Sequence, residues 1–214
     1  MKSIEKKVKY TTTNTYETLN TLTNKTKNVW IVFHGIGYLS RYFLKYFKEL
    51  NPDENYIIAP QAPSKYYLNG AYVHVGASWL TKENTNLELE NLNQYLEAVY
   101  EAEKIPKDLK LIIFGFSQGV SIVTRWVAYK KLACSELILY AGGIPNELNA
   151  SDFTFLENTN TKVTVIVGDK DEYLNEESMK TEKEKIKMLF NNKAEMIVFD
   201  GKHEVKKELI NGLV

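Results

Sequence analysis

The chain has 214 residues, of which 44% are apolar and 12% aromatic, which is enough to fill the core of a folded protein and excludes a disordered one. Its 27 basic and 27 acidic side chains cancel, so no summed positive field favours a nucleic acid as partner. Cys134 is the only cysteine, which excludes an internal disulfide and a cysteine-based zinc site and suits a reducing compartment.

The remaining composition favours a single cytoplasmic domain. The longest apolar run, residues 111–116, is far too short to cross a bilayer, so we expect no transmembrane segment. The charged residues 1–7 are not followed by an apolar stretch, so we expect no secretory signal. Repeats and Pro-rich or Gly-rich linkers are missing, which predicts one domain over residues 1–214.

The pattern of apolar side chains changes once along the chain. Residues 6–23 alternate loosely among threonines, which predicts an N-terminal antiparallel ribbon. Short apolar runs typical of buried parallel strands follow, at residues 29–33, 56–59, 109–114, 137–140, 163–167 and 196–199. Helical spacing separates several of them, most clearly from about residue 86 to residue 103. This alternation predicts a doubly wound, mostly parallel α/β sheet, in which ligands lie beyond the carboxyl ends of the strands.

The strongest chemical signal is Gly115-Phe116-Ser117-Gln118-Gly119, which lies between a predicted strand and a predicted helix. This is the setting of the G-x-S-x-G turn that exposes a nucleophilic serine. Glycines two residues before and after Ser117 are needed because the turn is too tight for side chains there. The following helix begins at Gln118, so its positive end would stabilise negative charge that develops near Ser117.

A serine nucleophile needs a histidine base, and the chain has three histidines. In hydrolases with this turn, the acid and then the histidine follow the serine along the chain. Only His203, after the last predicted strand, satisfies that order; the alternative is a surface histidine in a polar turn. His34 and His74 precede Ser117, and we expect each to hold its own loop by hydrogen bonding.

Three carboxylates compete for the acid, all after the strand predicted at residues 163–167. Asp171 is favoured because it is far enough past Gly168 to reach a histidine loop. Asp169 stays open as an alternative, although its place at the strand end suits a turn-forming residue. Glu172 is interpreted as solvated charge.

An acyl-transfer site also needs N–H donors for the oxyanion. The amide after the nucleophile, that of Gln118, would supply one of them. The glycine-rich loop His34-Gly35-Ile36-Gly37 follows the first predicted parallel strand, and the Ile36 amide is the natural second donor.

These residues together resemble the carboxylesterase/phospholipase family of α/β-hydrolases, which includes bacterial carboxylesterases and acyl-protein thioesterases. The matching pieces occur in the family's order: His34-Gly35-Ile36-Gly37, Ala59-Pro60-Gln61-Ala62-Pro63, Ala77-Ser78-Trp79, the Ser117 pentapeptide, Gly168-Asp169-Lys170-Asp171 and Gly201-Lys202-His203. The resemblance implies an α/β-hydrolase fold and a serine hydrolase that needs neither metal nor cofactor. It implies Ser117, Asp171 and His203 as triad, and Ile36 and Gln118 as amide donors. Tyr38 and Lys202 depart from the family's pattern, which bears on substrate preference.

The site is expected to be open, because the stretch between the strands at 137–140 and 163–167 is too short for a large cap domain. The longest connection, between residues 59 and 86, is rich in aromatic side chains, and connections of this length are usually functional. The residues considered as substrate contacts are His34, Tyr38, Tyr66, Tyr67, His74 and Trp79. For Tyr66, Tyr67 and Trp79, a purely structural place in the core stays an equal alternative.

The sequence therefore predicts a serine esterase that hydrolyses short- to medium-chain carboxylic esters through an acyl-enzyme. The alternatives are an acyl-protein or acyl-CoA thioesterase and a non-catalytic binding protein with the same fold. The expected partner is a small-molecule ester or thioester, and the tyrosine-rich composition could support a homodimer.

Overall fold

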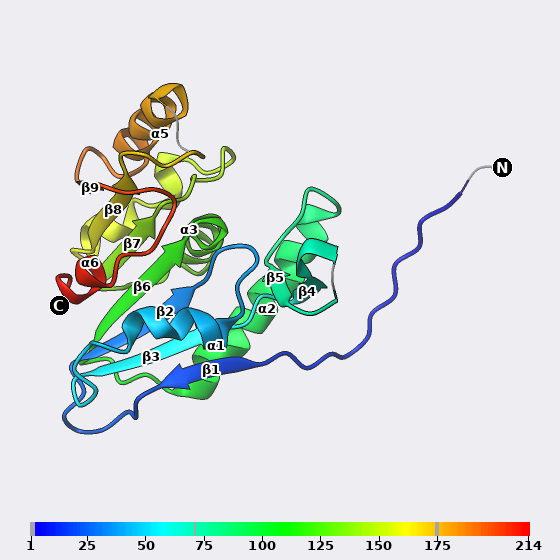
Figure 1. Ribbon diagram of the computed structural model, residues 1–214, viewed down its shortest axis with the longest axis horizontal. Coiled ribbons are helices and arrows are strands. Elements are labelled where there is room, and N and C mark those ends of the chain that lie inside the picture. Colours follow the sequence, from blue (N-terminus) through cyan, green and yellow to red (C-terminus); the bar gives the residue numbers. More distant parts are fainter. Residues whose placement is uncertain (1–2, 71, 174–175) are drawn as a thin grey trace.

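The structure is a computed structural model that describes residues 3–70, 72–173 and 176–214. Its centre is a seven-stranded sheet in the order β1-β3-β2-β6-β7-β8-β9 (Figure 1). All neighbouring strands are parallel except β1, which runs antiparallel to β3. The strands are β1 (Tyr16–Leu19), β2 (Asn28–Phe33), β3 (Asn55–Pro60), β6 (Lys110–Phe116), β7 (Glu136–Tyr140), β8 (Lys162–Gly168) and β9 (Glu195–Phe199).

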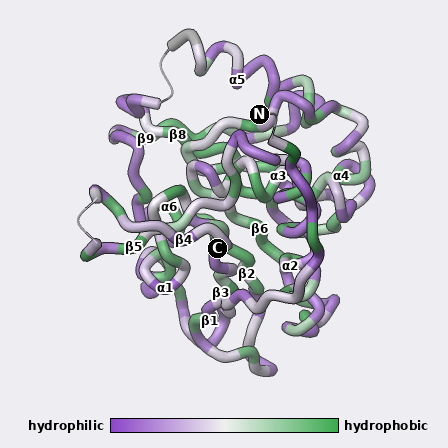
Figure 2. The backbone as a smooth tube through the Cα atoms, turned by 90° about the vertical axis from the view of Figure 1, so that its right-hand side faces the viewer, coloured by the Kyte–Doolittle hydropathy of each residue, from purple (hydrophilic) through white to green (hydrophobic). Residues whose placement is uncertain are grey.

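The predicted α/β class and its mostly parallel sheet are confirmed, and the six apolar runs lie in strands of the sheet except for residue 109, which precedes β6. Side chains alternate between the two faces, as strand geometry requires: Val29 and Ile31 join one core cluster, whereas Trp30 and Val32 join the other. Figure 2 shows hydrophobic residues concentrated along the central strands.

Helices cover both faces of the sheet and thereby bury these clusters. One face receives α2 (Thr85–Glu103), α3 (Gln118–Lys130), α4 (Phe155–Asn158) and α5 (Glu176–Leu189). The other face receives α1 (Ser40–Phe43), the 3-10 helix η1 (Leu44–Phe47) and α6 (Lys207–Asn211). The expected helix from about residue 86 to residue 103 corresponds to α2.

The N-terminal ribbon is shorter than expected. Only Tyr16–Leu19 of the predicted range 6–23 forms a strand, and it pairs with the edge of β3. Residues 3–13 are exposed and form no strand, and Figure 1 shows this segment leading away from the sheet. The reason is the excess of lysine and threonine, which leaves little apolar surface to bury against a partner.

The long connection after β3 contains a hairpin that the apolar pattern did not indicate. Strand β4 (Ser64–Tyr67) pairs antiparallel with β5 (Val75–Ser78), and the 3-10 helix η2 (Leu68–Gly70) begins the turn between them. The stretch between β7 and β8 holds only α4 and the 3-10 helix η3 (Ala150–Asp152), which agrees with the absence of a large cap that the sequence predicted.

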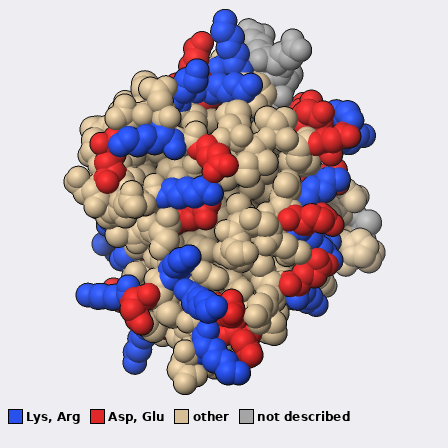
Figure 3. Space-filling view, turned by 90° about the vertical axis from the view of Figure 1, so that its left-hand side faces the viewer, with Lys and Arg blue, Asp and Glu red and all other residues tan. Residues whose placement is uncertain are grey.

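Two further features are the distribution of charge on the surface and the length and polarity of the helices. The face drawn in Figure 3 shows acidic and basic side chains interspersed, as the balanced charge suggests. Within the described residues, the helices are too short or too polar to cross a lipid bilayer.

Candidate active site

Ser117 lies at the junction of β6 and α3, on a sharp backbone turn. Its φ of 54° and ψ of −119° fall in a region that L-residues rarely adopt, so the backbone is strained there. The turn closes tightly, because a Cβ added to Gly115 would lie 2.6 Å from the carbonyl oxygen of Gly119. The Ser117 N–H donates to the Tyr140 carbonyl at 2.9 Å, which attaches the turn to β7. The expected nucleophile turn therefore has the geometry that the glycine spacing required.

His203 and Asp171 complete a chain of hydrogen bonds with Ser117. Ser117 Oγ lies 2.8 Å from His203 Nε2, and His203 Nδ1 lies 2.8 Å from Asp171 Oδ2. Because a carboxylate only accepts, Nδ1 carries the imidazole proton and Nε2 is left to accept the Ser117 hydroxyl proton. The Asp171 side chain is fully buried, which strengthens its interaction with the ring.

The structure separates the two competing aspartates that follow β8. Asp171 contacts His203, and its other oxygen accepts the Tyr173 N–H at 2.9 Å. Asp169 instead accepts the Gly201 N–H at 3.0 Å and so ties together the loops after β8 and β9. Glu172 is exposed. Asp171 is thus the carboxylate brought to the histidine.

The glycine-rich loop after β2 lies directly beside the nucleophile. A Cβ added to Gly35 would lie 3.1 Å from Ser117 Cβ, so only a glycine fits without a shift. Ile36, the next residue, is 54% exposed on this loop. Gln118 is the first residue of α3, so its N–H has no partner within the helix. Both expected oxyanion donors are thereby placed on segments that adjoin Ser117.

His34 supports the loop from inside the core. Its side chain is fully buried; Nδ1 donates to the Gly35 carbonyl at 2.8 Å, and Nε2 accepts the Ala62 N–H at 3.3 Å. Burial lowers the pKa of His34 to about 4, so the ring is neutral at neutral pH. This neutral form matches the two bonds, and His34 has the loop-holding place that the sequence indicated.

The aromatic candidates for substrate contact fall into different environments. Trp79 is 1% exposed and packs against His34, so the core alternative describes it. Tyr38 is half-buried, with its ring against Phe116 and its hydroxyl bonded to Tyr46. Tyr66 is exposed, and its hydroxyl would lie 3.8 Å from a Cβ on Gly37, in the glycine-rich loop after β2. Tyr66 is therefore the exposed aromatic candidate that lies beside the glycine-rich loop.

The other two candidates lie further along the hairpin. Tyr67 packs against Tyr72 with ring centroids 5.1 Å apart, and it is 53% exposed. His74 is exposed at the hairpin turn, where its carbonyl accepts the Leu68 N–H at 2.7 Å. Among the described residues, the side-chain hydrogen bonds and ring contacts of Ser117 and His203 involve neither of them.

Two tyrosines that sequence reasoning missed contact the triad segments. The Tyr173 ring stands edge-on to His203, with centroids 4.7 Å apart, while 70% of the residue is exposed. Tyr140, at the end of β7, accepts the Ser117 N–H through its carbonyl and the Lys206 N–H through its hydroxyl, at 3.0 Å. The sequence does offer a reason to consider Tyr173, because it follows Asp171 by two residues. It offers no such reason for Tyr140.

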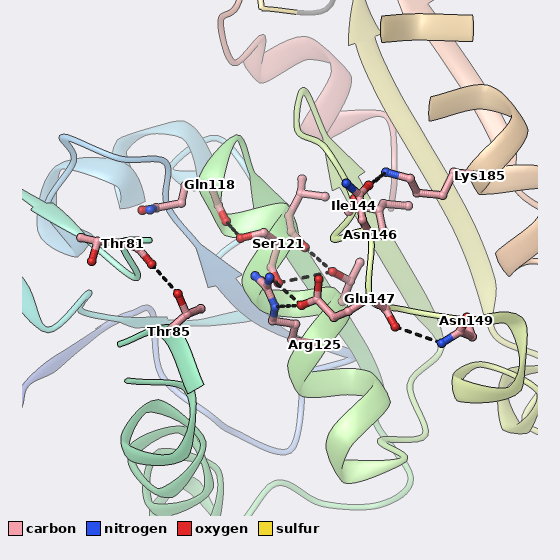
Figure 4. Close-up of polar contacts among 12 residues, drawn as sticks. Thr81, Thr85, Gln118, Ser121, Arg125, Ile144, Asn146, Glu147, Asn149 and Lys185 are labelled. Atoms are coloured by element: carbon pink, nitrogen blue, oxygen red, sulfur yellow. Dashed lines mark hydrogen bonds and ion pairs between the residues drawn. The ribbon is translucent and has the colours of Figure 1, made fainter. Parts of the chain in front are cut away.

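The loop after β7 closes the opposite side of the turn. A Cβ on Gly142 would lie 2.3 Å from the Ser117 carbonyl oxygen, so this loop touches the turn directly. Figure 4 shows how polar side chains fasten the continuation of the loop: Arg125 bonds Glu147, and Lys185 donates to the Ile144 carbonyl at 2.8 Å. Groups of three or more metal-ligating side chains were not found among the described residues.

The comparisons with known proteins establish the family and the fold. The sequence profile of the phospholipase/carboxylesterase family matches residues 14–213. The chain belongs to this family. Proteins with curated functions include none that matches the sequence.

Solved structures of the same architecture extend over nearly the whole chain. Acyl-protein thioesterase 2 from Zea mays has 13% sequence identity and a TM-score of 0.69, over 94% of this chain and 96% of that one. A phospholipase/carboxylesterase from Dyadobacter fermentans has 22% identity and a TM-score of 0.67, over 95% and 97%. The carboxylesterase from Bacillus cereus has 14% identity and a TM-score of 0.63, over 92% and 90%. At such identities the likeness establishes the α/β-hydrolase fold alone.

Proposed function

We propose that the protein is a serine esterase that hydrolyses short- to medium-chain carboxylic esters. The observation that carries the proposal is the unbroken chain of hydrogen bonds from Ser117 Oγ through His203 to Asp171, with 2.8 Å at each step. A chance serine–histidine contact would not also place the serine on a strained turn at a helix N-terminus. Family membership alone does not assign the chemistry to these three side chains.

In the proposed mechanism, Ser117 Oγ attacks the carbonyl carbon of the ester while His203 Nε2 takes its proton. The Ile36 and Gln118 amides bind the negative oxygen of the tetrahedral intermediate. His203 then gives the proton to the departing alkoxide, which leaves as an alcohol. Water attacks the acyl-enzyme with His203 as base, and the acid is released with Ser117 restored. Asp171 holds the imidazole tautomer and stabilises its cation throughout.

The preference for modest acyl chains is supported by the surroundings of Ser117. In the part of the chain that the structure describes, only a short loop, η3 and α4 connect β7 to β8, which is too little for a large cap. The rim carries exposed side chains, with Ile36 54% and Tyr173 70% exposed, and a long acyl chain would gain little burial there.

A thioesterase is the second candidate. The similar structures include both carboxylesterases and an acyl-protein thioesterase, and the triad chemistry serves either bond. Matched oxygen-ester and thioester substrates with the same butyryl group distinguish the two, because only the leaving atom differs. A kcat/KM ratio above about tenfold in favour of the thioester would make the second candidate the better description.

The decisive experiment replaces the nucleophile. Ser117→Ala should lower hydrolysis of p-nitrophenyl butyrate by at least about 10³-fold, because the remaining groups offer no nucleophile. Ser135→Ala, at an exposed serine before β7, is the matched control and should keep wild-type activity. A fluorophosphonate probe should label the wild-type protein and the control but not Ser117→Ala. Near-native turnover by Ser117→Ala would refute the assignment, and a wild-type protein that is neither active nor labelled would favour a binding protein.

A further inference from the structure

The side-chain amide of Gln118 is fully engaged by the backbone that follows β5. Its Oε1 accepts the Trp79 N–H at 2.9 Å, and its Nε2 donates to the Leu80 carbonyl at 2.8 Å. Nε2 also lies 3.1 Å from Ser78 Oγ. Figure 4 shows this side chain pointing from the start of α3 toward the segment that carries Thr81. The first residue of α3 is therefore attached to residues 78–80 by both ends of one amide.

The same segment also holds the loop that carries Ile36. Trp79 Nε1 donates to the His34 carbonyl at 2.7 Å. The Gly37 N–H donates to the Ala77 carbonyl at 2.9 Å, and the Ala77 N–H donates to the Tyr38 carbonyl at 3.1 Å. Residues 77–79 thus bond the glycine-rich loop on both sides of Ile36.

The two proposed oxyanion donors belong to elements far apart in the sequence. Residues 77–80 form hydrogen bonds with each of these two elements. One end of this connection is the Gln118 side chain, and the other is the Trp79 indole with the Ala77 backbone. These bonds are short, and the groups are buried or half-buried, so they restrict relative movement of the two amides.

We infer that the side chain of Gln118 is a positioning residue that sets the separation of the Ile36 and Gln118 amides. The inference rests on the proposed function and assigns the side chain a task separate from that of its backbone N–H. Its contacts run to Trp79 and Leu80, so it acts on the oxyanion through the loop that these residues support. Oxyanion bonds form fully only in the transition state, so a misplaced donor lowers kcat and leaves KM nearly unchanged.

The test replaces Gln118 by methionine, which keeps the length of the side chain and removes both polar ends. We expect kcat on p-nitrophenyl butyrate to fall by about 10- to 100-fold, because small misplacements of catalytic groups have effects of that size. KM should stay within about threefold of the wild-type value. Affinity for a butyl trifluoromethyl ketone, which forms an oxyanion on Ser117, should fall by the same factor as kcat/KM. Gln94→Met, on the exposed side of α2, is the matched control and should change none of these values.

A second variant keeps the test informative if Gln118→Met does not fold. Trp79→Phe removes the indole N–H and weakens the other end of the connection, where the Ala77 backbone bonds remain, so it should lower kcat and ketone affinity together. Where both variants fold, the double variant should lose less than the product of the single losses, because both act through residues 77–80.

The outcomes separate this inference from the proposed function. An active, probe-labelled wild type with kcat and ketone affinity unchanged in Gln118→Met would overturn the inference alone. A rise in KM with unchanged kcat would also overturn it, since it would indicate a substrate contact. A wild type without turnover or labelling would overturn both.

Discussion

Replacing Asp171 by asparagine should nearly abolish turnover, because the structure fixes the orientation of the new amide. One oxygen of Asp171 accepts the Tyr173 N–H, and the other accepts His203 Nδ1–H. In Asp171→Asn the amide oxygen stays on the Tyr173 N–H, so the NH₂ group faces His203. That group donates to Nδ1, the ring proton moves to Nε2, and Nε2 no longer accepts the Ser117 proton.

The expected loss follows from two contributions. At an effective dielectric constant of about 20, opposite charges about 4 Å apart interact by roughly 4 kcal/mol, and the imidazolium of the transition state loses this stabilisation. That interaction corresponds to about 10³-fold in rate, and the wrong tautomer lowers the rate further. We therefore expect a fall in kcat on the order of 10⁴-fold, the size found for this substitution in other triads.

The assay is steady-state hydrolysis of p-nitrophenyl butyrate, with circular dichroism to verify the fold. Asp169→Asn is the matched control, because its amide oxygen still accepts the Gly201 N–H, and it should keep activity within about threefold. Asp171→Ala should be no less active than Asp171→Asn. An asparagine variant more active than the alanine variant would show that the amide has flipped and would refute the reasoning.

Two further predictions concern the residues that support the site. Tyr140→Phe removes the acceptor of the Lys206 N–H, so the segment after His203 is held less firmly. We expect kcat to fall several-fold and the free energy of unfolding, measured in urea, to fall by roughly 1 kcal/mol. An unchanged kcat would contradict the role of Tyr140 in holding this segment. Acid should destabilise the fold through His34, whose folded pKa of about 4 lies below its ordinary 6.5. As the pH falls, His34 is protonated in the unfolded chain before it is protonated in the folded one. The contribution of neutral His34 to the free energy of unfolding is therefore fully present above about pH 6.5 and is lost as the pH falls toward about 4. The loss from His34 should reach about 2 kcal/mol between about pH 7 and about pH 5, and His34→Gln, measured in the same urea titrations, should lack it.

The sequence indicated the strands and the Ser117 turn because these features depend on short patterns. A buried parallel strand is a nearly continuous apolar run, as at 111–114 and 163–167, and it is readable without knowing its neighbours. The turn around Ser117 needs glycines at fixed positions, so its place is also local. Distance along the chain favours Asp171 over Asp169, and the structure brings Asp171 to His203.

Other features depend on contacts between distant segments and leave no local pattern. The hairpin strand Val75–Ser78 contains glycine, alanine and serine, which lack the branched side chains typical of strands. It pairs with β4, and its Gly76 packs closely against Gly37, which is distant in the sequence. The bonds of the Gln118 amide reach 38 or more residues back along the chain. The N-terminal ribbon was predicted too long because threonine favours strands, but a strand also needs a partner edge and apolar surface to bury.

The backbone conformation of Ser117 lowers the stability of the fold in exchange for the exposed hydroxyl that the proposed reaction needs. A residue with a side chain at φ 54° and ψ −119° costs on the order of 1–3 kcal/mol, which the contacts of Gly115, Gly142 and the Tyr140 carbonyl must offset. Glycine would relieve that conformation but would remove the hydroxyl. Under the proposed function, the fold keeps at its nucleophile a conformation that stability alone would not favour, and the exposed hydroxyl is the reason for it.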